Sequence, residues 1–195
     1  MNVIRITTII FMLLFISSCT RDSRKNESSW SESSNGLSAK LVFFYTDSST
    51  HAKVIHPKLL LRNDSNTPIK FFKCVYYAGS FSIKTSSGKK MEEPLCIRRS
   101  GPQGAQIVVI SPSEVIEFDT YDYGYGLKPD NSIYAFNTNS LQLELKRGKY
   151  IVDYSLIVNK SEIKKILESF DWIKDDPNTV WTGQISIKNI EMYLE

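Results

Sequence analysis

The cysteine at position 19 is the residue of this chain whose setting points most directly to chemistry. It follows two small serines and ends a short apolar run, residues 9–16, with Arg5 on the amino-terminal side. A basic start, a short apolar stretch and small residues before a cleavage point are typical of a secretory signal segment. A spanning helix needs roughly 20 apolar residues, and this run is shorter. We therefore expect the segment to direct export and to be removed.

Residues 16–19, Ile-Ser-Ser-Cys, resemble the lipobox of bacterial lipoproteins. The resemblance implies a signal peptide over residues 1–18, cleavage between Ser18 and Cys19, and a diacylglyceryl group on the Cys19 thiol, because only a sulfur nucleophile forms the thioether. Two or three acyl chains, at about 0.8 kcal/mol per buried CH2, attach a protein stably to a membrane. Thr20 is not the aspartate that retains enterobacterial lipoproteins at the inner membrane, which favours the outer membrane in a host that has one. The alternatives are an ordinary secretory signal and an uncleaved anchor helix.

Residues 19–36 are predicted to be the lipidated cysteine and a flexible linker. They are rich in serine and charge, and Trp30 is their one large apolar residue. Such a segment buries too little apolar surface to offset its ordering entropy. A free chain of this length spans roughly 20 to 25 Å. Residues 37–195 then remain as one domain of ordinary size.

The charge balance argues against a nucleic-acid partner. The signal segment contains one of the 24 basic residues, which leaves 23 basic against 21 acidic residues. Phosphate binding needs a concentrated basic face.

Two further cysteines, Cys74 and Cys96, follow Cys19. An even number of thiols in an oxidising compartment favours a disulfide. The bond would close a loop of about 22 residues and stabilise the fold by roughly 3 kcal/mol. Two buried, unbonded thiols are the alternative, because sequence does not show whether the side chains meet.

Catalytic and metal-binding patterns are sparse in the domain. The two histidines, His51 and His56, lie near Asp47 but lack a further clustered nitrogen or sulfur ligand, so we predict no metal site. The sequence holds neither a phosphate-binding glycine loop nor a nucleophile elbow. Its carboxylate pairs lie in predicted turns, where solvated acids are more common than the paired carboxyls of glycoside hydrolysis. We expect no enzyme activity and no cofactor.

A tyrosine-rich stretch is the main candidate for recognition. Tyr121, Tyr123 and Tyr125 alternate with glycine and aspartate in a long predicted connection. Tyrosine offers a large rigid contact area and a hydroxyl at little entropic cost. Arg98 and Arg99 lie in another predicted loop and could add cations to the same surface. The alternative is that the three rings cover the edge of the sheet.

Alternation of apolar and polar residues predicts half-buried β-strands. It runs through residues 37–45, 141–146 and 150–158, and shorter apolar runs separated by turn clusters lie at residues 58–62, 69–77, 81–85, 106–110, 115–118 and 184–194. Many short strands with regular turns are typical of a β-sandwich. Ile163, Ile166, Leu167 and Phe170 follow helical spacing instead, so we expect one short helix before the last strands, with Asn159 as its cap.

Residues 145–150, Leu-Lys-Arg-Gly-Lys-Tyr, resemble the tyrosine corner of immunoglobulin-like sandwiches. In those folds the tyrosine hydroxyl bonds to the backbone near a sheet-to-sheet corner, which implies that role for Tyr150. Residues 181–183, Trp-Thr-Gly, are similar to the last-strand pattern of small bacterial immunoglobulin-like modules, including proteinase-inhibitor-like ones. The resemblance implies an all-β, immunoglobulin-like Greek-key sandwich over residues 37–195.

The predicted function is a lipid-anchored, non-catalytic module that binds a protein or a glycan in the cell envelope. Sandwich ends present loops on a rigid frame, which suits recognition. Three alternatives stay open: an immunoglobulin-like inhibitor of a protease or other hydrolase, an envelope hydrolase, and a structural component of an envelope complex.

Overall fold

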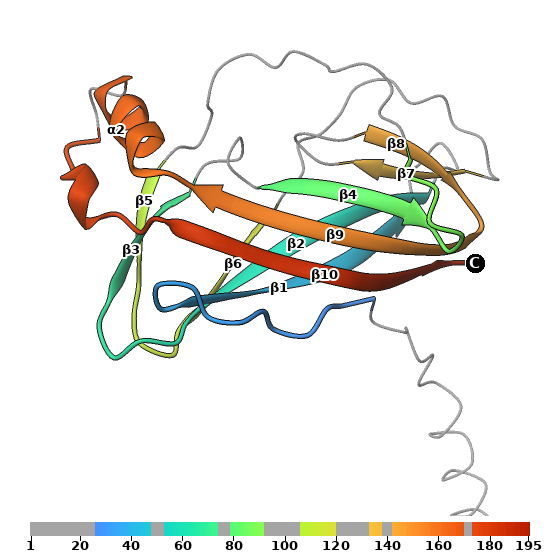
Figure 1. Ribbon diagram of the computed structural model, residues 1–195, viewed down its shortest axis with the longest axis horizontal. Helices are drawn as coiled ribbons and strands as arrows, with labels where there is room; N and C mark the ends of the chain where they lie inside the picture. Colours follow the sequence, from blue (N-terminus) through green and yellow to red (C-terminus); the bar gives the residue numbers. More distant parts are fainter. Residues whose placement is uncertain are drawn as a thin grey trace, which may run out of the picture.

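The computed structural model describes residues 26–47, 53–73, 79–91, 106–119, 133–137, 142–169 and 173–195 (Figure 1). Most of these residues lie in β-strands, and the predicted all-β class is confirmed. The strands are β1 (Leu37–Asp47), β2 (Lys53–Asn63), β3 (Ile69–Lys73), β4 (Ser80–Thr85), β5 (Gln106–Ile110), β6 (Val115–Asp119), β7 (Ile133–Asn137), β8 (Gln142–Lys146), β9 (Gly148–Val158) and β10 (Gly183–Leu194).

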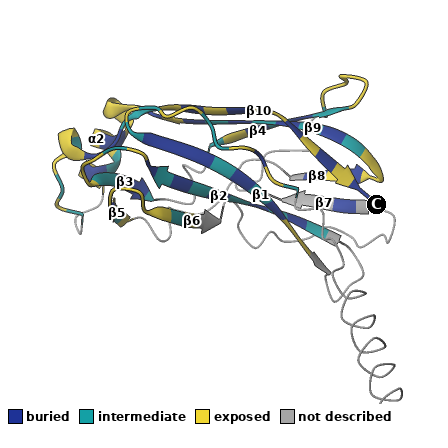
Figure 2. Cartoon of the chain, turned by 90° about the horizontal axis from the view of Figure 1, so that it is seen from below, coloured by how far each residue is buried: buried dark blue, intermediate teal, exposed yellow. Residues whose placement is uncertain are grey.

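The strands form three sheets. The largest has the order β1-β2-β7-β8, with β6 also paired to β2; a second has the order β10-β9-β4; and β3 pairs with β5. Every strand pair is antiparallel except β2 and β7, which run parallel. In Figure 2 the β4-β9-β10 sheet forms one layer and β1, β2 and β6 to β8 lie in the layer below it.

The core fills the space between these layers. Along β9 every second residue is buried, from Tyr150 to Val158, as the alternation predicts. Among the described residues, Tyr154 is the largest fully buried side chain, and its ring centroid lies 4.9 Å from that of Phe81. Burial raises the pKa of Tyr154, so its hydroxyl stays neutral. The alternation therefore identified the buried face of this strand correctly.

Two strands differ from the sequence prediction. β2 begins at Lys53, whereas the apolar run predicts a start at Lys58. The observed strand therefore includes Pro57, and a proline inside a run normally argues against a strand. Pro57 is tolerated since it lies opposite Phe43, whose N–H points away from β2 to the Asn26 carbonyl, 2.8 Å distant. The proline thus occupies a position where β1 needs no donor. β7, which no pattern predicted, is short and apolar without alternation.

The predicted helix is present as α2 (Lys160–Ser169). Ile163 and Leu167 are buried and Ile166 packs against the core, as the spacing predicts. A short 3-10 turn, η2 (Pro177–Thr179), follows it and is capped by the Asp176 carboxylate. Both elements lie at one end of the long axis, beside β3 and β5 (Figure 1).

Residues 26–36 correct the predicted linker, because they pack on the sandwich. We call this segment the N-terminal strap. The Ser28 N–H donates to the Leu41 carbonyl at 2.9 Å, and the Ser28 hydroxyl accepts from the Leu41 N–H at 3.0 Å. Ser31 pairs with Ala39 in the same two ways. The linker prediction was wrong for residues 26–36. Their serines form hydrogen bonds with the backbone N–H and carbonyl groups along the edge of β1, as a neighbouring strand would.

Candidate functional site

Most residues singled out in the sequence lie outside the described residues. These are Ser18, Cys19, Cys74, Cys96, Arg98, Arg99, Tyr121, Tyr123 and Tyr125. The lipidation, disulfide and tyrosine-loop assignments therefore stay predictions. Within the described residues, no group of three His, Cys, Asp or Glu side chains is placed to hold a metal ion.

Tyr150 lies where the chain passes from one sheet to the other. β8 belongs to the larger sheet and β9 to the three-stranded sheet, and only Arg147 separates them. The Tyr150 hydroxyl donates to the Lys146 carbonyl at 2.9 Å and accepts from the Lys146 N–H at 3.1 Å. One phenol thus fixes the strand end before the corner, in the way the resemblance implies.

The N-terminal strap spans the gap between β1 and β10. At its start, the Asn26 side chain donates to the Tyr193 carbonyl at 3.4 Å and also bonds the Tyr45 hydroxyl. At its end, the Asn35 side chain donates to the Thr182 carbonyl at 2.7 Å. The strap therefore joins the first strand of one sheet to the last strand of the other.

Side chains of the strap add contacts across β1. The Arg62 guanidinium lies 4.4 Å from the centroid of the Trp30 ring and bonds Asp64 at 2.5 Å. Lys40 and Glu27 form an ion pair at 3.1 Å. Trp30, the one aromatic residue of the segment, was the sequence signal for packing that the serine content obscured.

The position of the strap limits how far the domain can lie from Cys19. Asn26, the first described residue, is seven positions after Cys19 (26 minus 19). A fully extended chain covers at most about 3.6 Å per residue, so the two residues are no more than about 25 Å apart. Any group attached at Cys19 is therefore held within about 25 Å of the end of the domain at Asn26.

That end carries exposed cations and aromatic rings, and we call it the basic end. Its cations are Lys89 and Lys90 after the turn that follows β4, and Lys146 and Arg147 at the β8–β9 corner. All four are exposed, and none forms an ion pair with another described residue. Its exposed rings are those of Phe44, Tyr45 and Tyr193.

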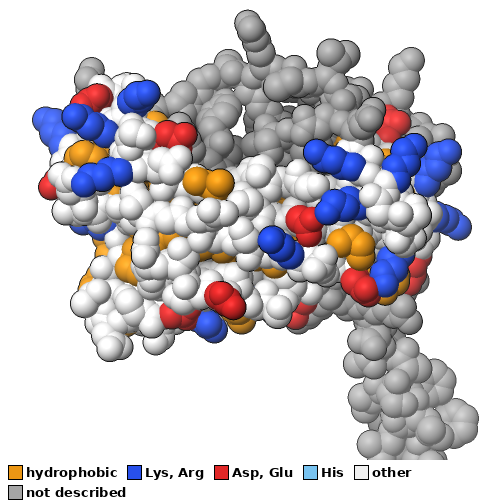
Figure 3. Space-filling model, viewed as in Figure 1, with side chains coloured by type: hydrophobic (Ala, Val, Ile, Leu, Met, Phe, Trp, Pro, Cys, Tyr) orange, Lys and Arg blue, Asp and Glu red, His pale blue; other side chains and the backbone are white. Residues whose placement is uncertain are grey.

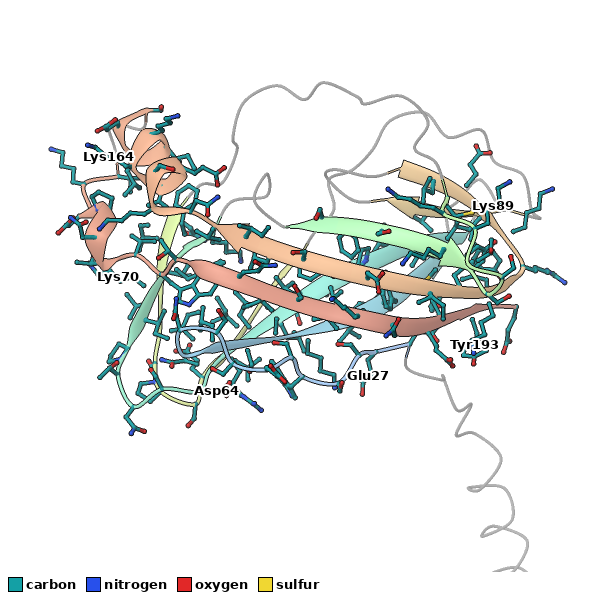
Figure 4. All side chains as sticks on the ribbon, in the orientation of Figure 1. Glu27, Asp64, Lys70, Lys89, Lys164 and Tyr193 are labelled. Carbon is teal, nitrogen blue, oxygen red and sulfur yellow. The ribbon has the colours of Figure 1, made fainter. Side chains whose placement is uncertain are left out.

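Direct contacts hold the parts of the basic end together. The Lys149 ammonium lies 5.3 Å from the centroid of the Tyr193 ring, and the Ser86 N–H donates to the Lys149 carbonyl at 3.2 Å. Because Asn26 also bonds Tyr193, the turn after β4, the corner and the start of the strap share one end of the sandwich. Figure 4 shows Lys89 and Tyr193 at this end and Lys164 and Lys70 at the other.

Electrostatics at the basic end centre on Lys149. Its ammonium lies 2.5 Å from the Glu191 carboxylate, which also accepts from the Tyr193 hydroxyl at 2.6 Å. The hydrogen bond to Glu191 raises the pKa of Lys149, and the hydrogen bond from Lys149 lowers the pKa of Glu191. Both side chains are open to solvent, so the pair orders the surface without adding much to stability.

The opposite end, which we call the helical end, consists of α2, η2 and the loops at residues 64–68 and 111–114. Its ion pairs are Lys70 with Asp175 at 2.6 Å and, along α2, Lys164 with Glu168 at 3.9 Å. In Figure 3 Lys and Arg side chains gather at both ends of the β4-β9-β10 face and are fewer between them.

Asn63, at the end of β2, fixes both loops of the helical end. Its side chain is fully buried and donates to the Thr67 and Ile110 carbonyls, each at 2.8 Å. Its carbonyl oxygen accepts from the Ser65 N–H at 2.9 Å and the Ser65 hydroxyl at 2.7 Å. The sequence does not indicate this role, because a buried asparagine at the end of a strand has no local pattern that marks it.

Asp153 organises the outer face between the two ends. Its carboxylate accepts from the Asn189 N–H at 2.9 Å and pairs with Lys84 at 3.0 Å. Burial alone would raise the pKa of Asp153, but the hydrogen bond from Asn189 and the pairing with Lys84 outweigh it and lower the pKa. Asn189 lies at the bulge in β10 where the register with β9 shifts, and its φ is +57°.

Comparison with known proteins found no match: no family model, no curated protein and no solved structure is similar to this chain at a significant level. In the part of the chain that the structure describes, no helix is both long and apolar enough to cross a membrane. The residues and their geometry are therefore the basis for assigning a function.

Proposed function

We propose that this chain is a lipid-anchored envelope protein whose β-sandwich is a non-catalytic binding module for a protein or a glycan. The observation that carries the proposal is the sequence of residues 16–19, with Cys19 after two small residues at the end of a short apolar run. The fold agrees with this, since the described domain begins seven residues later and forms a rigid frame with loops at both ends. We place the protein in the cell envelope, at the outer membrane where one exists.

An immunoglobulin-like Greek-key arrangement is part of the proposal. Two layers of mostly antiparallel strands and the hydroxyl bond of Tyr150 at the sheet crossing support it. The parallel pairing of β2 with β7 differs from the antiparallel pairing of the other described strand pairs.

Metabolic labelling with palmitate tests the anchor. Cells that make the full chain should incorporate the label, and Cys19→Ser should abolish incorporation because the thioether can no longer form. Cys74→Ser is the matched control, since it removes a thiol elsewhere and should leave labelling unchanged. Label absent from the unaltered chain would reject the anchor.

Capture of a partner tests the binding role. Crosslinking in the envelope should recover a protein or a glycan with the unaltered chain, and replacing Tyr121, Tyr123 and Tyr125 by serine should abolish recovery with the melting temperature nearly unchanged. Tyr193→Ser is the matched control and should keep recovery, because it removes an exposed tyrosine outside the predicted recognition loop. A large fall in melting temperature in the triple variant would assign the three rings to the core. Substrate turnover by the purified protein would instead favour the hydrolase alternative.

A further inference from the structure

We propose that the basic end is a membrane-docking surface that lies on anionic lipid headgroups. This inference rests on the proposed lipid anchor and adds an orientation: the anchor holds the domain with the β8–β9 corner and the turn after β4 toward the bilayer. The helical end then points away from the membrane, where it is free to meet a partner.

The short connection is the first reason. The strap starts to pair with β1 at Asn26, so at most about 25 Å of chain separates the sandwich from Cys19. A fully extended segment of 17 residues would reach about 60 Å, more than twice as far. Because the strap takes up part of that length, the basic end is held within about 25 Å of the anchored residue.

The aromatic residues of this end are the second reason. Six large hydrophobic residues are prominently exposed in the described part of the chain, and three of them are Phe44, Tyr45 and Tyr193. The other three, on β5, β6 and β9, are aliphatic. Tyrosine is enriched at membrane–water interfaces, where its ring meets the acyl boundary and its hydroxyl meets water. The three prominently exposed aromatic rings of the described residues thus lie at the end of the domain from which the chain leads to Cys19.

Charge is the third reason. Lys89, Lys90, Lys146 and Arg147 are exposed and have no ionic partner among the described residues. The exposed acids on β8 and at the end of β10 are Glu144 and Glu195. Among the described residues of the basic end, these four cations outnumber the two acids, apart from the Lys84–Asp153 and Lys149–Glu191 pairs. Juxtamembrane cations are attracted to the negative surface potential of anionic lipids.

Hydrogen exchange of the full lipidated chain in vesicles tests the docking. Backbone amides of residues 86–90 and 146–149 should exchange about fivefold more slowly in vesicles that contain phosphatidylglycerol than in pure phosphatidylcholine. Amides of α2 should exchange equally in both. Replacing Lys89, Lys90, Lys146 and Arg147 by glutamine should remove the difference between the two lipids.

The helical end supplies the matched control. Its exposed cations Lys160, Lys164, Lys165 and Lys174, replaced by glutamine, should leave the lipid dependence intact. Equal exchange at the basic end in both kinds of vesicle would overturn the docking. A chain that does not float with vesicles and whose mass shows no acyl group would overturn the proposed anchor itself, so the two failures are distinguishable.

Discussion

The two ends of the sandwich are built in different ways. The helical end is fixed from within, by the buried Asn63 side chain and its four hydrogen bonds, and its Lys70 is paired with Asp175. The basic end is fixed from its edges, by the strap and by Tyr150, and it leaves four cations unpaired among the described residues. The helical end also has exposed lysines, but the exposed acids Glu162, Glu168 and Asp176 accompany them. The difference teaches that a nearly neutral chain can still present one basic surface, because the placement of its acids decides which cations remain uncompensated.

Replacement of Asn63 by alanine is the strongest test of the internal support. It leaves the Ile110 carbonyl and the Ser65 N–H without their partner, and we expect a loss of about 3 kcal/mol in the free energy of unfolding. That corresponds to a fall of roughly 6 to 12 °C in melting temperature for a domain of this size. Asn66→Ala, in the same loop but exposed, should change the melting temperature little. Equal effects of the two variants would contradict the role of Asn63.

The strap can be tested at Ser28, which is buried and completes the edge of β1. Ser28→Ala leaves the Leu41 N–H without an acceptor, so we expect a loss of about 1 to 2 kcal/mol and faster amide exchange at Leu41. Ser29→Ala is the control, because Ser29 is exposed. If Ser28→Ala changed neither quantity, the strap would be a loose linker as its composition suggests.

The corner at Tyr150 should give a smaller effect. Tyr150→Phe removes two hydrogen bonds to Lys146 and keeps the buried ring, and we expect a loss of about 1 kcal/mol measured by urea unfolding. Tyr193→Phe removes an exposed hydroxyl bond to Glu191 and should be nearly neutral. A neutral Tyr150→Phe would mean that the corner is held by packing alone.

Acid should lower the free energy of unfolding slightly, because it protonates Asp153 on the outer face. Its pKa is lower in the folded state, so its contribution is present above the ordinary aspartate pKa of about 3.9 and is lost as pH falls through the lowered value. Asp153→Asn should therefore lower the melting temperature a little at pH values near neutrality and have less effect in acid. Glu144→Gln, at an exposed position of β8, is the comparison; the same pH dependence in both variants would exclude a specific role for Asp153.

The sequence predicted the elements that depend on local periodicity. The buried faces of β1 and β9 and the packed face of α2 follow directly from apolar spacing. Tyr150 was predicted from a short resemblance, and its hydroxyl makes the expected kind of bond to the backbone. These features depend on residues close together in the chain, where side-chain period and secondary structure are coupled.

Features that depend on distant partners could not be predicted. The strap has the composition of a linker, because its serines find their hydrogen-bond partners only when the edge of β1 lies beside them. Asn63 looks like a turn residue, although its partner Ile110 lies 47 positions away. The cations of the basic end come from two short segments, Lys89 with Lys90 and residues 146–149, and only the fold places these segments side by side.

The central claim is that an anchor at Cys19 holds the sandwich by its basic end. Paramagnetic broadening of amide signals, with a spin label on the lipid headgroups and the full lipidated chain in a nanodisc, tests it most directly. The account predicts strong broadening at residues 86–90 and 146–149 and little at Lys160–Ser169. Equal broadening at both ends, or stronger broadening in α2, would contradict it.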